Sequence, residues 1–125
     1  MTDAVQMELR SFEGHNRLLV VFAKDENDAQ LKQQHTLIRD HEKAMSERDV
    51  RLFTVLGDAA PAAGGSPEDW RRTLEVDGDG FAAVLIGKDG TEKTRWDAPV
   101  SWTELEQRID AMPMRQAEAA EQGGV

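Results

Sequence analysis

The segment from Leu18 to Ala23 constrains the fold of this chain more than any other, because each of its residues (LLVVFA) is apolar. A strand that is apolar on both faces must be covered on both faces, as the central strands of α/β proteins are. An acidic turn, Lys24 to Asp28, follows the strand and leads into a helix-like segment. The sequence therefore predicts a central strand in a sheet that carries helices on both sides.

The rest of the chain continues this alternation of strands and helices. From periodicity, capping signals and turn residues we expect helices at 27–46, from Ser66 and from Ser101, and strands at 51–56, 81–86 and 92–96. Residues 57–66 are a loop by composition. The order β-α-β-α-β-β-α predicts a right-handed crossover between two parallel strands, followed by an antiparallel hairpin. The expected fold is α/β, with a four-stranded mixed sheet and helices on both faces.

A chain of 125 residues is expected to form one domain. We assign residues 1–16 to an N-terminal extension, 17–112 to the domain, and 113–125 to a C-terminal tail that is partly helical or disordered. The expected apolar anchors of the extension are Met7, Leu9 and Phe12.

The charge balance disfavours two classes of partner. The chain has 24 acidic and 15 basic residues and a net charge of −9, so it repels nucleic acid and anionic membrane. No apolar run approaches the roughly 20 residues of a membrane span. The start of the chain, MTDAVQMELR, has no signal-peptide pattern. The expected location is cytoplasmic as written, and periplasmic or secreted if the chain is a trimmed mature form.

The order of the elements resembles the thioredoxin fold. Proteins of that fold place Cys-x-x-Cys at the start of the helix after the first strand, and the matching positions here are Asn27 and Gln30. The usual cis-proline precedes the third strand, where this chain has Gly80, Phe81 and Ala82. The chain contains no cysteine, which excludes thiol-disulfide oxidoreductase and peroxiredoxin activity.

Four segments carry a closer resemblance, and it spans nearly the whole chain. They are RLLVVFA, SERDVRLF, GFAAVLIGKDG and IDAMPMRQAE. Together they resemble a bacterial family known as domain of unknown function 4174, which is similar to modules of the extracellular protein equarin and of the sushi-repeat proteins. The resemblance implies a thioredoxin-like fold and no established activity.

Three acids surround the expected start of the first long helix: Asp25, Glu26 and Asp28. Acids in such a cluster bind a hard cation such as Ca²⁺, or they cap the helix and complement its dipole. We favour capping, because their spacing matches no Ca²⁺ loop. The segment Asp77 to Gly80 (DGDG) begins like an EF-hand but lacks the later ligands, so we interpret it as a turn. The sequence predicts no metal and no cofactor.

The three histidines do not form a motif. His35 and His41 are six positions apart, whereas helical zinc sites usually use a spacing of about four residues. His41 shares a helix side with Ile38 and Met45, so we interpret it as a residue at the edge of the core. His15 precedes the first strand and has no identifiable partner.

The segment from Met112 to Arg115 (MPMR) interrupts the last helix, because proline disfavours helix at the preceding residue. We prefer a packing role, in which Met112 and Met114 cap the core and Arg115 pairs with an acid. The alternative is that these residues bind a partner.

Taken together, these patterns favour a non-catalytic binding module for a protein or peptide. Its expected binding surface joins the turn Lys24–Gln30 to the loop Asp77–Ala82. One alternative is a non-thiol enzyme with Asp25 or Glu26 as general acid or base beside a histidine. Another is metal binding by the acidic turn. The sequence predicts no oligomeric state and no catalytic residue.

Overall fold

The sheet is mixed and four-stranded, with the order β2-β1-β3-β4. A computed structural model describes residues 4–57 and 65–123. The strands are β1 (Arg17–Ala23), β2 (Val50–Leu56), β3 (Ala82–Ile86) and β4 (Glu92–Trp96). β1 pairs in parallel with β2 and antiparallel with β3, and β3 pairs antiparallel with β4. The predicted mixed sheet and strand directions are confirmed.

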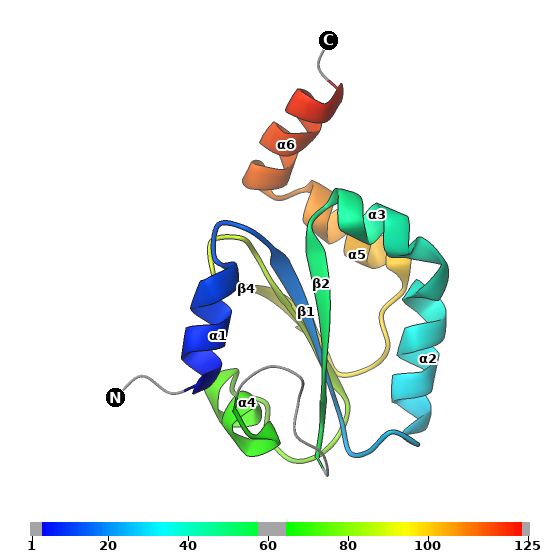
Figure 1. Ribbon diagram of the computed structural model, residues 1–125. Coiled ribbons are helices and arrows are strands. Elements are labelled where there is room, and N and C mark those ends of the chain that lie inside the picture. Colours follow the sequence, from blue (N-terminus) through cyan, green and yellow to red (C-terminus); the bar gives the residue numbers. More distant parts are fainter. Residues whose placement is uncertain (1–3, 58–64, 124–125) are drawn as a thin grey trace.

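Helices cover both faces of this sheet (Figure 1). They are α1 (Ala4–Phe12), α2 (Ala29–Ile38), the 3₁₀ turn η1 (Arg39–His41), α3 (Glu42–Glu47), α4 (Pro67–Thr73), α5 (Trp102–Asp110) and α6 (Pro113–Gly123). α1 and α4 lie on one face, and α2, α3 and α5 lie on the other. α6 follows α5 and projects beyond the end of the sheet (Figure 1).

β1 is the central element, and every one of its residues is buried. Leu19, Val21 and Ala23 face the cluster that α2, α3 and α5 complete. The alternate residues, with Phe22 at the end of the strand, join Trp70 of α4 in a second cluster. The double-sided apolar pattern of β1 therefore reflects one core on each face of the sheet.

The helix predicted over 27–46 is in fact broken. η1 separates α2 from α3, although no proline or glycine occurs between Ile38 and Glu42. The bend keeps both halves on the core, since Met45 of α3 joins the same cluster as Leu31 of α2.

The helix starts at Ser66 and Ser101 occur where the sequence predicted them. Ser66 and Asp69 form a full capping box ahead of α4. Ser101 accepts a hydrogen bond from the Glu104 N–H, which is one half of the predicted box. Most of the predicted loop 57–66, residues 58–64, lies outside the described residues.

The segment assigned to an N-terminal extension contains α1. Its buried side chain is Val5, and Leu9 and Phe12 pack against the same cluster. The prediction that Met7 is an anchor was wrong, because Met7 is 61% exposed. The described part of the chain contains no helix with both the length and the apolar content needed to cross a bilayer.

Candidate functional site

The acidic turn after β1 has a structural role in the fold. Asp25 Oδ1 accepts a hydrogen bond from the Asn27 N–H at 2.9 Å. Asp28 is the N-cap of α2, and its Oδ1 accepts from the N–H groups of Gln30 (2.9 Å) and Leu31 (3.1 Å). The capping role predicted for one of these acids is confirmed for Asp28.

The positions that the sequence analysis matched to a redox site lie at one end of the sheet. Ala82 pairs with Phe22 in the β1–β3 ladder, so the loop before β3 meets the end of β1, where the acidic turn begins. Asn27 and Gln30 are exposed. No cis peptide bond occurs among the described residues.

Arg71 of α4 contacts both the loop before β3 and the Phe22 side chain of β1. Arg71 Nη2 donates to the Gly80 carbonyl at 3.0 Å. Its guanidinium carbon lies 5.2 Å from the centroid of the Phe22 ring. A pocket of about 540 Å³ is lined by this loop and by β4 residues such as Arg95 and Trp96. The turn Lys24–Gln30 does not line that pocket, so the predicted surface is not one continuous hollow.

The three histidines occupy different environments. His41 stacks on Trp102 with 5.5 Å between ring centroids, which supports its interpretation as a core-edge residue. His15 and His35 are exposed. Within residues 4–57 and 65–123, no group of three or more histidine or acidic side chains is arranged to hold a metal ion.

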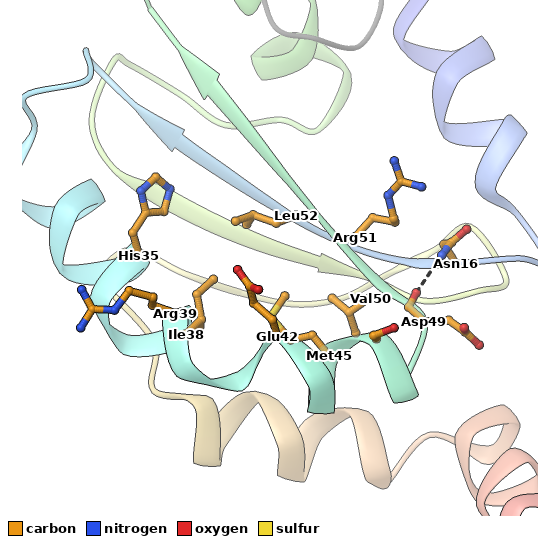
Figure 2. Close-up of a pocket in the computed structure, with 11 residues that line it drawn as sticks. Asn16, His35, Ile38, Arg39, Glu42, Met45, Asp49, Val50, Arg51 and Leu52 are labelled. Carbon is orange, nitrogen blue, oxygen red and sulfur yellow. Dashed lines mark hydrogen bonds between the residues drawn. The ribbon is translucent and has the colours of Figure 1, made fainter.

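A groove runs along the free side of β2, which forms one edge of the sheet. It has a volume of about 550 Å³ and lies between β2 and the helical segment α2–η1–α3 (Figure 2). Its apolar walls are Ile38 and Met45 from the helices and Val50 and Leu52 from β2. Such a hollow beside an edge strand was not predicted from the sequence.

Polar side chains of both signs surround these apolar walls. His35 and Arg39 lie at one end of the groove, and Asn16 and Asp49 lie at the other (Figure 2). Glu42 stands between α3 and β2 near the middle. The groove therefore combines apolar walls with charged side chains at separated positions.

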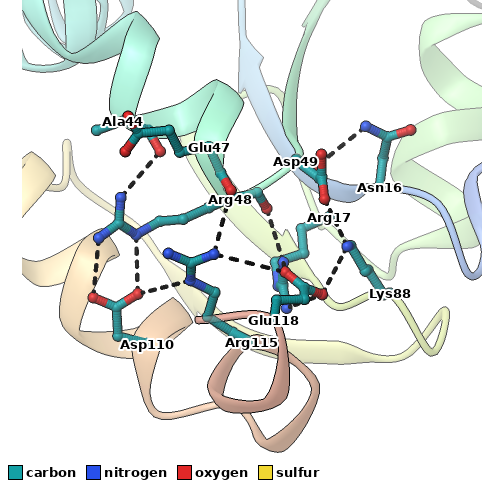
Figure 3. A network of polar contacts seen from close by, with 10 residues as sticks. All are labelled: Asn16, Arg17, Ala44, Glu47, Arg48, Asp49, Lys88, Asp110, Arg115 and Glu118. Carbon is teal, nitrogen blue, oxygen red and sulfur yellow. Dashed lines mark hydrogen bonds and ion pairs between the residues drawn. The ribbon is translucent and has the colours of Figure 1, made fainter. Parts of the chain in front are cut away.

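A partly buried polar network lies at the opposite end of β1 from the acidic turn (Figure 3). Arg17 is fully buried. Its two terminal nitrogens donate to the two carboxylate oxygens of Glu118 at 3.1 and 3.2 Å. Lys88 Nζ lies 2.7 Å from both Glu118 Oε2 and Asp49 Oδ2. Arg17 and Lys88 thus share the carboxylate of Glu118, a residue of α6.

The same network continues to the α3–β2 and α5–α6 junctions. Arg48 makes a bidentate pair with Asp110 at 2.9 and 3.1 Å. Arg115 Nε donates to Asp110 Oδ1 at 3.3 Å. The hydrogen bond from Arg48 and its charge, helped by Arg115, hold the pKa of the Asp110 carboxyl below its ordinary value of 3.8 despite partial burial.

Glu118 is also held in its charged form. Its burial disfavours the carboxylate, but hydrogen bonds from Arg17 and Lys88 together outweigh that effect and lower the pKa of Glu118 from its ordinary value of 4.5. Glu118 and Asp110 are therefore both charged at neutral pH.

The four segments that carry the family resemblance all contribute to this network. RLLVVFA supplies Arg17, SERDVRLF supplies Arg48 and Asp49, and GFAAVLIGKDG supplies Lys88. IDAMPMRQAE supplies the remaining members, which are Asp110, Arg115 and Glu118. Of these residues, sequence reasoning had singled out only Arg115. The sequence signal that could have found the other members is the presence of charged residues inside each of the four segments.

The MPMR segment follows the packing interpretation at Met112 and Arg115 but not at Met114. Met112 is buried beside Ile109, and Arg115 pairs with Asp110, as the packing interpretation predicts. Met114 is 46% exposed, so the prediction that it caps the core was wrong.

One comparison identifies the family of the chain. Residues 8–118 match the model of the family described as "Domain of unknown function (DUF4174)". Because the match covers most of the 125 residues, the chain belongs to this family. No curated protein matches the chain.

Proposed function

We propose that this member of the family is a non-catalytic, thioredoxin-like binding module that takes an extended peptide along the free edge of β2. The parallel β1–β2 pair and the antiparallel β3–β4 hairpin support the thioredoxin-like part. The non-catalytic part rests on Asn27 and Gln30, which stand where redox relatives carry cysteines.

The observation that carries the proposal is the groove beside β2. An edge strand offers unpaired backbone N–H and C=O groups, and a peptide can add to it as a further strand. Side chains of an added strand alternate between its two faces. Every second side chain of the peptide would then enter the groove between β2 and the helices, above Val50 and Leu52.

The groove also suggests which peptides would bind. Its apolar walls favour a central apolar anchor. Arg39 at one end of the groove favours an acidic residue on that side of the anchor. Backbone pairing would supply affinity, and these side-chain positions would supply specificity.

The test is a selection of random peptides displayed on phage against the full chain. Two charge reversals are then compared on the selected peptides: Glu42→Arg in the groove and Glu26→Arg on the acidic turn. Both glutamates are exposed, so neither change is expected to affect folding.

We expect Glu42→Arg to change peptide affinity by about five- to tenfold, and Glu26→Arg to leave it unchanged. Amide NMR signals of residues 50–56 should shift when the peptide is added. If the shifts and the mutational effect occur at residues 24–30 instead, the β2 site is wrong. If the selection yields no binding peptide, the peptide-binding function is wrong.

A further inference from the structure

A second hollow, outside the β2 groove, lies between the β3–β4 hairpin and the junction of α5 with α6. Its volume is about 640 Å³, within the range of pockets that bind small molecules, roughly 300–1,000 Å³. The hairpin contributes Gly87 to Asp89 together with Lys93 and Thr94. The helical junction contributes Gln107, Arg108 and residues 111–114, and Arg17 completes the lining.

The charge of this lining is opposite to that of the whole chain. Four cations (Arg17, Lys88, Lys93 and Arg108) line the pocket, against a single carboxylate, Asp89. Acidic residues outnumber basic ones by 24 to 15 in the full sequence. Among the lining residues alone, cations therefore outnumber carboxylates by four to one, and which of them are open to an anion depends on their existing partners.

The cations fall into two pairs that differ in exposure. Arg17 and Lys88 are the buried, inner pair, and Lys93 and Arg108 are the exposed, outer pair. Glu118 and Asp49 already neutralise the inner pair, Arg17 and Lys88. Arg17 nevertheless keeps one buried donor, Nε, without a hydrogen-bond partner among the described residues. A buried donor of this kind is stabilised by any acceptor that reaches it.

The outer pair is accessible to a ligand. The side chains of Lys93 and Arg108 are 34% and 56% exposed. Lys93 Nζ donates a hydrogen bond to Asp89 Oδ2 at 2.6 Å. Arg108 and Glu104 are separated by 3.9 Å, which is beyond hydrogen-bond distance. The guanidinium of Arg108 can therefore receive an anionic group without breaking a hydrogen bond to Glu104.

The other side of the pocket is apolar. Met112 is buried, whereas Met114 is 46% exposed; Pro113, the first residue of α6, lies between them. Methionine side chains adapt to ligands of irregular shape. The exposure of Met114 at a pocket wall is explained if an apolar group packs against it.

We propose that this pocket binds a small amphipathic carboxylate, with its carboxylate at Arg108 and Lys93 and its apolar part along Met112 and Met114. The site shares no lining residue with the β2 groove, so this proposal does not depend on the peptide-binding function.

The test uses calorimetry or NMR titration of the full chain with decanoate, and with decanol as the uncharged probe of equal chain length. We expect decanoate to bind more tightly than decanol. Arg108→Gln and Lys93→Gln should each weaken decanoate by about five- to tenfold and leave decanol unchanged. Arg10→Gln is the matched control, because Arg10 is exposed on α1 and does not line the pocket.

Met114→Ala should weaken both probes, since it removes apolar contact without changing charge. Equal affinity for decanoate and decanol would overturn the carboxylate specificity. An equal loss in Arg10→Gln would show that the attraction is non-specific. The absence of binding by either probe would overturn the site.

Discussion

Gln34 shows how one polar side chain can join distant parts of this fold. It is fully buried on α2. Its Nε2 donates to the Val100 carbonyl at 2.9 Å, and its Oε1 accepts from the Val100 N–H at 2.8 Å. Val100 lies just before α5 and is itself buried. The glutamine thus pairs with a backbone segment as another strand would, and fixes α2 against the start of α5.

We expect Gln34→Ala to lower the free energy of unfolding by about 3 kcal/mol, because it leaves the buried Val100 N–H and C=O without partners. Gln33→Ala is the matched control: Gln33 is the preceding residue on α2 and is exposed, so its change should stay within about 0.5 kcal/mol. Both values come from urea denaturation. Similar midpoints for the two variants would contradict the structural role of Gln34.

The partner of Gln34 could not be found from the sequence. The two residues are 66 positions apart, and nothing in the sequence near Val100 signals an unpaired backbone segment. The same limit applies to Arg17. Its position next to an apolar run is visible in the sequence, but its carboxylate partner lies 101 positions away on α6.

Among the elements, those with strong local signals were the most predictable. The strands and the starts of α4 and α5 follow from alternation, apolar runs and capping residues, which act over a few neighbouring positions. The break at η1 has no such signal, since neither proline nor glycine occurs there. α6 was not predicted as a full helix, because its sequence has no apolar stripe. In the structure, Arg115 is the only buried side chain among residues 113–121 of this helix.

The acidic turn provides a test at the scale of one helix. We expect Asp28→Ala to destabilise the protein by about 1 kcal/mol, since it removes the acceptor for the Gln30 and Leu31 N–H groups. Asp28→Asn should retain most of the stability, because asparagine is an equally good N-cap. Glu26→Ala is the control, as Glu26 is exposed and is not the N-cap. Urea denaturation measures all three.

The same variants separate capping from the cation-binding alternative. Millimolar Ca²⁺ should leave the denaturation midpoint of the unmodified protein unchanged. A rise in that midpoint, lost in Asp28→Ala, would favour cation binding by the turn over a purely structural role.

At the scale of the whole molecule, two kinds of interaction hold the parts together. The sheet is held by an apolar core on each face, whereas α6 is held largely through charge. Arg115 pairs with Asp110, and Glu118 pairs with Arg17 and Lys88. These two attachments should therefore respond differently to pH.

We expect acid to release α6 before it unfolds the sheet. The pKa values of Glu118 and Asp110 are lowered in the folded protein, from ordinary values of 4.5 and 3.8. A carboxyl with a lowered folded pKa contributes stability above its unfolded pKa, and that stability is lost as the pH falls through the folded value. The contribution is complete at neutral pH and declines as the pH falls through the ordinary values of 4.5 and 3.8 towards the lower folded values. Hydrogen exchange, as rates relative to an unstructured chain at the same pH, should show α6 losing protection while β1 keeps it.

Glu118→Gln should reproduce this release at neutral pH, because an uncharged amide cannot neutralise both Arg17 and Lys88. Glu121→Gln is the matched control, since Glu121 lies one turn further along α6 and is exposed. Its α6 protection should equal that of the unmodified protein. Loss of protection in α6 and β1 at the same pH would show instead that α6 and the sheet unfold as one cooperative unit. Full protection of α6 in Glu118→Gln would show that the carboxylate does not hold the helix.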